Sequence, residues 1–137
     1  MKILTSLEIC FSFFSLSASA NDPVAERKVN FKANGAAMRA FGGQLAIDDF
    51  AGIAAGADKI ANWASILTTY FPEGSESEGA RDEIWFEFEK FTALAQNNQN
   101  AALALKTAAE SGDKAAIQQA VQTLGASCKA CHSSFKN

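Results

Sequence analysis

Four stretches of the chain carry apolar residues at helical spacing, and this pattern constrains the fold more than any other feature. They cover about residues 23–46, 50–70, 80–110 and 114–135. Within each, apolar side chains recur every three or four positions, which places them on one face of an α-helix. No run alternates with the period of two typical of a strand, and the connections are short. The pattern predicts an all-α, antiparallel four-helix bundle.

Helix boundaries are marked by residues with known terminal preferences. Asp22 can cap the first helix, with Pro23 in its first turn. Pro72 disfavours helical backbone in the residue before it, so the second helix should end near Tyr70. Residues 72–79 are rich in Pro, Gly, Ser and Glu, which predicts an exposed loop before the third helix. Ser111-Gly112-Asp113 combines a glycine terminator with a capping aspartate and separates the last two helices.

The first 20 residues read as a secretory signal peptide. Lys2 precedes an apolar run from Ile9 to Leu16, and Ala18-Ser19-Ala20 has the small-residue pattern of a cleavage site. The run is too short to span a bilayer, so we expect no membrane anchor. Cleavage would remove Cys10 and leave one domain, residues 21–137, in which two cysteines remain.

Charge and composition exclude some classes of partner. The chain carries 15 acidic and 12 basic residues, a net charge of −3, and its basic residues form no patch. We therefore expect no nucleic-acid partner. Eleven phenylalanines and a hydrophobic fraction of 48% suit a compact helical core with room for one flat aromatic cofactor.

The last ten residues contain the most specific motif, Cys128-Lys129-Ala130-Cys131-His132, and His132 is the only histidine of the chain. On a helix the two thiols and the imidazole share one face. This is the arrangement in which two cysteines bind the vinyl groups of a haem and the histidine ligates its iron. A dithiol redox pair would need no adjacent histidine, and a zinc site would need two more ligands. We expect one haem c per chain.

A four-helix domain with this motif at its C-terminal end resembles the class II c-type cytochromes, and within them the cytochrome c′ family. The resemblance covers essentially the whole mature chain. Its most specific part is the block from Leu124 to His132. Supporting matches are Arg27-Lys28-Val29-Asn30-Phe31-Lys32, Phe71-Pro72 and Ile84-Trp85.

The resemblance implies roles for residues outside the motif. Arg27 and the adjacent Lys28 would bind the haem, Arg27 by meeting a propionate. Phe31 matches the position that covers or ligates the iron on the distal side. Glu78 and Gly79 fall where the family brings backbone close to a propionate. Lys136 stands where the family often has arginine, which keeps the charge but loses the planar fork.

The sixth iron ligand decides what such a protein does. Met38 is the only methionine of the mature chain, and it follows Phe31 by seven residues, about 10 Å along a helix. Both cannot cover one iron, so we expect a five-coordinate, high-spin haem under Phe31, with Met38 in the core. An open site behind an apolar lid favours nitric oxide and carbon monoxide. Four further aromatic residues could contact the haem or form core, namely Trp63, Trp85, Phe88 and Phe91.

Two alternatives remain open. Met38 could be the sixth ligand of a low-spin electron carrier, or Cys128 and Cys131 could form a redox pair in a haem-free bundle. Catalysis has little support, because the chain has no second histidine for acid–base chemistry. The resemblance further implies electron transfer in the bacterial periplasm and a homodimer formed through the first two helices. The small residues Gly35, Ala36, Gly42 and Gly43 would allow that contact if they face outward.

Overall fold

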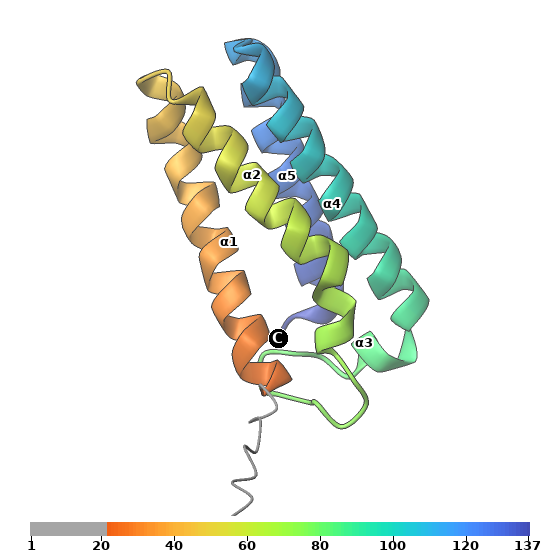
Figure 1. The fold of residues 1–137 in the computed structure, drawn as a ribbon. Coiled ribbons are helices and arrows are strands. Elements are labelled where there is room, and N and C mark those ends of the chain that lie inside the picture. Colours follow the sequence, from red (N-terminus) through yellow and green to blue (C-terminus); the bar gives the residue numbers. More distant parts are fainter. Residues whose placement is uncertain (1–21) are drawn as a thin grey trace, which may run out of the picture.

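The computed structural model describes residues 22–137, so the expected signal peptide lies outside the described residues. Four long helices run alternately up and down (Figure 1). This part of the chain contains no β-strand and only one isolated bridge, between Ala80 and Lys136. The expected all-α, antiparallel four-helix bundle is confirmed. Its elements are α1 (Pro23–Ala46), α2 (Phe50–Ile66), the 3-10 turn η1 (Leu67–Tyr70), α3 (Glu83–Phe86), α4 (Phe88–Ser111) and α5 (Lys114–Phe135).

Helices α1 and α5 begin, and α4 ends, where their capping residues predict. The Asp22 carboxylate accepts the backbone N–H of Val24 at 2.9 Å, and Pro23 occupies the first turn of α1. The Asp113 carboxylate accepts two backbone N–H groups at the start of α5. Between α4 and α5, Gly112 has a φ of 70°, a left-handed conformation that favours glycine. These boundaries are fixed by local chemistry.

The third predicted helix is wrong in one respect, because the structure divides it into α3 and α4. Glu87 lies between them with φ −116° and ψ 42°, outside the helical region. The reason is a contact far away in sequence. The indole Nε1 of Trp85 donates to the carbonyl oxygens of Phe71 and Pro72, both at 3.1 Å. Trp85 thereby ties the short α3 to the end of η1, and α4 starts in a new direction.

The four long helices form a ring in which one seam is loose. Helix α2 packs extensively against α4 and also against α1, and α4 packs along α5, whereas α1 and α5 touch at few points. In Figure 1, α1 lies at the left and α5 lies behind α2 and α4. In the described part of the chain, no helix is long and apolar enough to cross a membrane.

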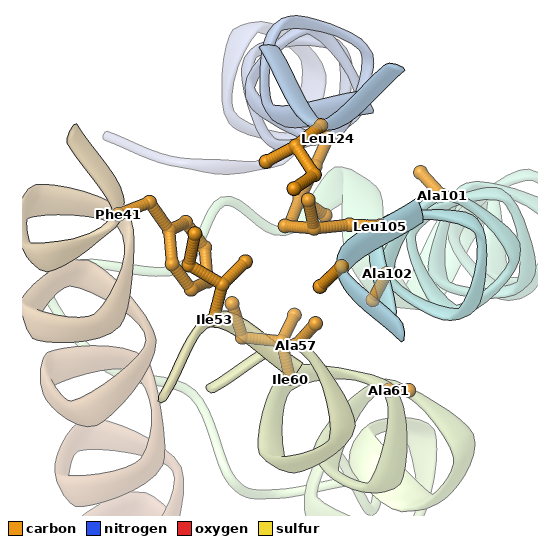
Figure 2. Close-up of a cluster of buried hydrophobic side chains, with 11 residues drawn as sticks. Phe41, Ile53, Ala57, Ile60, Ala61, Ala101, Ala102, Leu105 and Leu124 are labelled. Atoms are coloured by element: carbon orange, nitrogen blue, oxygen red, sulfur yellow. The ribbon is translucent and has the colours of Figure 1, made fainter. Parts of the chain in front are cut away.

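The buried side chains form two clusters, one towards each end of the bundle. In the first, Phe41, Ile53, Leu105 and Leu124 converge from all four long helices (Figure 2). The second is aromatic and includes Trp63, Phe71, Phe91 and Phe135. Its rings meet edge to face, with centroids 4.8 Å apart for Phe71 and Phe91 and 5.4 Å apart for Phe91 and Phe135. The aromatic cluster forms the floor of the cavity described next.

Candidate functional site

A cavity of about 510 Å³ lies between α1 and α5, at the loose seam of the bundle. Helix α4 and residues 77–80 complete its walls. Most of its lining is apolar, with basic side chains at several points. The residues that line it are Arg27, Lys28, Phe31, Lys32, Asn34, Gly35, Met38, Leu67, Phe71, Ser77, Gly79, Ala80, Ile84, Phe91, Leu94, Ala95, Asn98, Cys128, Cys131, His132, Phe135 and Lys136.

The α5 wall brings together the three motif residues, Cys128, Cys131 and His132. Both cysteines are half-buried, and neither forms a disulfide within the described residues. Burial raises the pKa of Cys131 to about 11, with a smaller contribution from the neighbouring Cys128. Burial likewise raises the pKa of Cys128. Thiols in this state contain little thiolate at neutral pH, which disfavours the alternative of a redox-active pair.

His132 projects from the same wall. Burial lowers its pKa, and the charge of Lys136 lowers it further. The ring is therefore neutral at pH 7, which is the form in which histidine binds metals. A structural zinc site needs four ligands. Among residues 22–137, no group of three or more His, Cys, Asp or Glu side chains is placed to hold a metal ion.

The α1 wall holds both candidates for the distal position. Phe31 and Met38 line the cavity two turns apart on the same face of α1. The Phe31 side chain is 38% exposed, whereas Met38 packs against the first core cluster. Asn34 lies between them and also lines the cavity, so the wall is not wholly apolar as we expected. The sequence signal for Asn34 is a polar residue on the helix face that Phe31 and Met38 share.

Arg27 lines the cavity as expected, but its hydrogen bonds run to protein groups. The side chain is 3% exposed. Its Nη1 donates to the carbonyl of Tyr70 and the hydroxyl of Ser75, each at 3.0 Å. Its Nη2 donates to the carbonyl of Ser75 at 2.6 Å and the hydroxyl of Ser77 at 3.0 Å. Four of its five N–H groups therefore bind the last residue of η1 and the loop that follows it.

The remaining expected residues divide into two groups. Lys28, Gly79 and Lys136 line the cavity, and Lys136 is held in place by the bridge to Ala80. Glu78 is not among the lining residues. Its carbonyl oxygen instead accepts the side-chain amide of Asn137 at 2.9 Å. Gly79 is thus the member of the pair whose backbone meets the cavity.

Asn98 on α4 is a site residue that the sequence analysis missed. Its side-chain amide donates to the Ser127 hydroxyl at 2.8 Å and to the Cys128 sulfur at 3.4 Å. Asn98 follows Phe91 by two helical turns, so an amide on an otherwise apolar stripe was the available signal. Of the four aromatic residues left undecided, Phe91 lines the cavity, and Trp63, Trp85 and Phe88 are not among its lining residues.

Comparison with known proteins identifies the family. A model of the family described as Cytochrome C′ matches residues 22–136. Cytochrome c′ of Rhodospirillum rubrum is 42% identical over 128 residues, which cover 87% of this chain and 86% of that protein. The chain belongs to the cytochrome c′ family. The resemblance expected from the C-terminal motif is confirmed.

Solved cytochromes c′ share the fold. The nitric oxide complex of a cytochrome c′ variant from Alcaligenes xylosoxidans has a TM-score of 0.72 and 27% identity, covering 85% of this chain and 94% of that one. A cytochrome c′ described as having an unusual ligand-controlled dimer dissociation has a TM-score of 0.75 and 22% identity, covering 83% and 93%. The second of these likenesses concerns the fold alone.

Cytochromes c′ carry covalently bound haem c with iron, and membership of the family gives this chain the same cofactor. The cavity fits the group. Its walls are mainly apolar, two thiols lie beside the one imidazole, and the exposed lysines at positions 28, 32 and 136 suit two carboxylates at its mouth.

Proposed function

We propose that this protein is a periplasmic c-type cytochrome with a five-coordinate, high-spin haem, which transfers electrons and binds nitric oxide and carbon monoxide. Cys128 and Cys131 would attach the haem, and His132 would be the single protein ligand of its iron. The observation that carries the proposal is the composition of the cavity. One wall holds the only imidazole of the chain. The α1 wall holds Phe31, whose ring cannot ligate a metal, two turns before Met38, which packs against the first core cluster.

Each wall would have a separate task. Bound haem would supply an iron that gains or loses one electron and can bind a small gas. His132 would hold that iron from the α5 side, and the two thioethers would prevent the ring from leaving. Phe31 would cover the other face and exclude water and bulky ligands. Lys28, Gly79 and Arg27 would meet the carboxylates.

Small uncharged gases suit this pocket better than anions or larger ligands. The cavity lining as a whole is mostly apolar, and Asn34 is the one neutral amide that α1 contributes to it. The Alcaligenes xylosoxidans relative, at 27% identity, supports gas binding because a variant of it forms a nitric oxide complex. Without a second histidine for acid–base chemistry, we propose a binding and electron-transfer protein and not an enzyme.

We further propose that the mature protein works in the periplasm as a homodimer. Export is supported by the signal-like pattern of residues 1–20. Dimer formation is supported by the outer face of α1, where Ala36, Gly42 and Gly43 are exposed and a Cβ added at either glycine would meet nothing within 4 Å. Small outward residues let two helices approach closely. The redox partner would be another periplasmic protein.

Absorption spectra of the purified mature holoprotein test the proposal. We expect haem staining to survive denaturing electrophoresis, a high-spin ferric spectrum, and spectral shifts when nitric oxide or carbon monoxide is added to the reduced protein. A C128S/C131S variant should lose the covalent stain. A colourless protein, or a wild-type ferric band typical of sulfur ligation, would overturn the proposal.

Two variants decide which residue of α1 covers the iron. Phe31→Met should introduce a sixth ligand and convert the ferric spectrum to low spin. Met38→Leu, its matched control on the same helix face, should leave the spectrum high-spin. An unchanged spectrum in Phe31→Met would count against placing residue 31 over the iron. A wild-type low-spin spectrum that Met38→Leu abolishes would establish the alternative electron carrier.

A further inference from the structure

Trp63 on α2 packs directly against Phe31 on α1. The two ring centroids are 5.6 Å apart, and the ring planes are nearly perpendicular, at 89°. Phe31 is 38% exposed on the cavity wall, whereas Trp63 is 4% exposed and is not a lining residue of the cavity. The buried Trp63 ring of the core therefore contacts the Phe31 ring of the site in an edge-to-face pair.

The position of Trp63 is set by packing and not by hydrogen bonding. Its other face meets Tyr70, with ring centroids 5.0 Å apart, and it belongs to the buried aromatic cluster with Leu67 and Phe71. Its Nε1 is buried and has no hydrogen-bond partner among the described residues. Trp63 is thus wedged between Tyr70 and Phe31, and any change in its size alters the surface on which Phe31 rests.

Phe31 needs such a support because it stands at an open position. A partly exposed phenylalanine on a helix has more than one staggered χ1 rotamer available, and only some of them direct the ring over the cavity. Among residues 22–137, Trp63 is the aromatic ring within contact distance of Phe31. The perpendicular contact favours the rotamer seen here over those that swing the ring towards solvent.

We propose that Trp63 is a positioning residue that keeps the Phe31 ring over the free axial position of the haem and so limits how fast a small gas reaches it. The inference rests on the proposed function, which places Phe31 over the iron. Trp63 would act only through Phe31, since it does not border the cavity. Its loss would leave haem attachment and the contribution of His132 unchanged.

The test is a double-mutant cycle on the ferrous holoprotein, read as the carbon monoxide association rate after flash photolysis. Trp63→Leu should speed association by about two- to tenfold, the range that corresponds to losing one aromatic pair. Trp63→Phe, which keeps an aromatic ring and protects the fold, should give a smaller increase. In a Phe31→Leu background, Trp63→Leu should cause no further change.

Trp85 supplies the matched control. It is another tryptophan of this end of the bundle, half-buried where Trp63 is buried. Its Nε1 donates to the Phe71 and Pro72 carbonyls, and among the described residues its ring contacts Phe71 and not Phe31. Trp85→Phe should leave the association rate unchanged. Helical circular dichroism and the haem content of every variant should match wild type before rates are compared.

The outcomes separate this inference from the proposed function. If Phe31→Leu changes the association rate but neither Trp63 variant does, the inference is overturned and the proposed function stands. An equal effect of Trp63→Leu with and without Phe31 would also overturn it, because Trp63 would then act by another route. If Phe31→Leu itself has no effect on the rate, the placement of Phe31 fails and the inference fails with it.

Discussion

Arg27 donates a hydrogen bond of 2.6 Å to the backbone carbonyl of Ser75 and so joins the first turns of α1 to the loop after η1. The same guanidinium lies 4.2 Å from the centroid of the Phe71 ring. Ser75 in turn donates its hydroxyl to the carbonyl of Pro72 at 2.7 Å. Arg27 therefore lines the cavity and also binds the loop segment that closes one end of it.

Replacing Arg27 should destabilise the protein as well as alter the site. Arg27→Met removes four hydrogen bonds from a charged donor and leaves two carbonyls unpaired, so we expect the free energy of unfolding of the holoprotein to fall by about 3 kcal/mol. Arg27→Lys keeps the charge but loses the planar guanidinium, so its free energy of unfolding should lie between those of wild type and Arg27→Met. Urea denaturation measures this. Arg39→Met, at an exposed position of the same helix, should change stability by less than about 0.5 kcal/mol. Equal effects at Arg27 and Arg39 would contradict the role of Arg27 in binding the loop.

Gly56 is required by the close approach of α1 and α2. A Cβ at Gly56 would lie 2.8 Å from Cε1 of Phe41, a side chain that is 1% exposed in the first core cluster. Gly56→Ala should lower the free energy of unfolding by about 1–3 kcal/mol, because the ring cannot move without disturbing its neighbours. Gly125→Ala, whose added Cβ would meet only Cε of Met38 at an ordinary 3.7 Å, should be neutral or stabilising by up to about 1 kcal/mol. Thermal unfolding that ranks the two variants in the opposite order would sink this account.

The ion pair between Asp58 and Lys106 links α2 to α4 at 2.7 Å and predicts a pH dependence. The hydrogen bond from Lys106, followed by its charge, lowers the pKa of Asp58, and the same pair of effects from Asp58 raises the pKa of Lys106. A carboxylate with a lowered pKa stabilises the fold above its unfolded pKa, about 3.9, and that stabilisation is lost as pH falls through the lower folded value. The stabilisation from Lys106 is fully present below the pKa of an unfolded lysine, about 10.4, and it is lost as pH rises through the raised pKa of Lys106 in the folded protein.

In Lys106→Met, the melting temperature should therefore fall slightly less steeply at acid pH than in wild type. Added salt should remove this small difference. The control is Lys59→Met, because Lys59 is exposed on α2 and forms no ion pair within the described part of the chain. Melting temperatures that fall equally steeply at acid pH in Lys106→Met and wild type at low salt would show that the pair contributes nothing measurable.

Asn34 should tune the bound gas. Its amide lines the cavity one turn beyond Phe31, and we expect it to donate towards a ligand held there. Asn34→Leu should raise the C–O stretching frequency of the ferrous carbon monoxide complex, because a donor near the ligand oxygen weakens that bond. Asn30→Ala serves as control, since the Asn30 amide is already bonded to the Glu26 carbonyl at 2.9 Å and does not line the cavity. Infrared spectra that coincide for Asn34→Leu and wild type would exclude the contact.

Features set by neighbouring residues could be predicted from the sequence, and features set by distant contacts could not. The start of α1 follows from Asp22 and Pro23, and its length follows from the apolar residues that recur along it. Cys128, Cys131 and His132 are brought to one wall by helical spacing alone. The break at Glu87 depends instead on Trp85 reaching two carbonyls more than ten residues earlier. No local pattern carries that information.

The same distinction explains what was missed in the site. Asn98 contacts Ser127 and Cys128 only because α4 and α5 pack side by side. The hydrogen bonds of Arg27 depend on the course of an irregular loop that propensities do not specify. Both residues lie on the predicted helices, so their positions were foreseeable while their partners were not.

The loose seam between α1 and α5 has a consequence for how the holoprotein is assembled. The residues proposed to attach the haem, Cys128 and Cys131, both belong to α5, which packs along α4. Haem attachment would therefore require only that the α4–α5 hairpin is accessible, and not that the four-helix bundle is complete. Helix α1, which packs chiefly against α2, would then pack against α5 and enclose the haem in a later step. The order of assembly would thus follow from which helix pairs pack extensively and which do not.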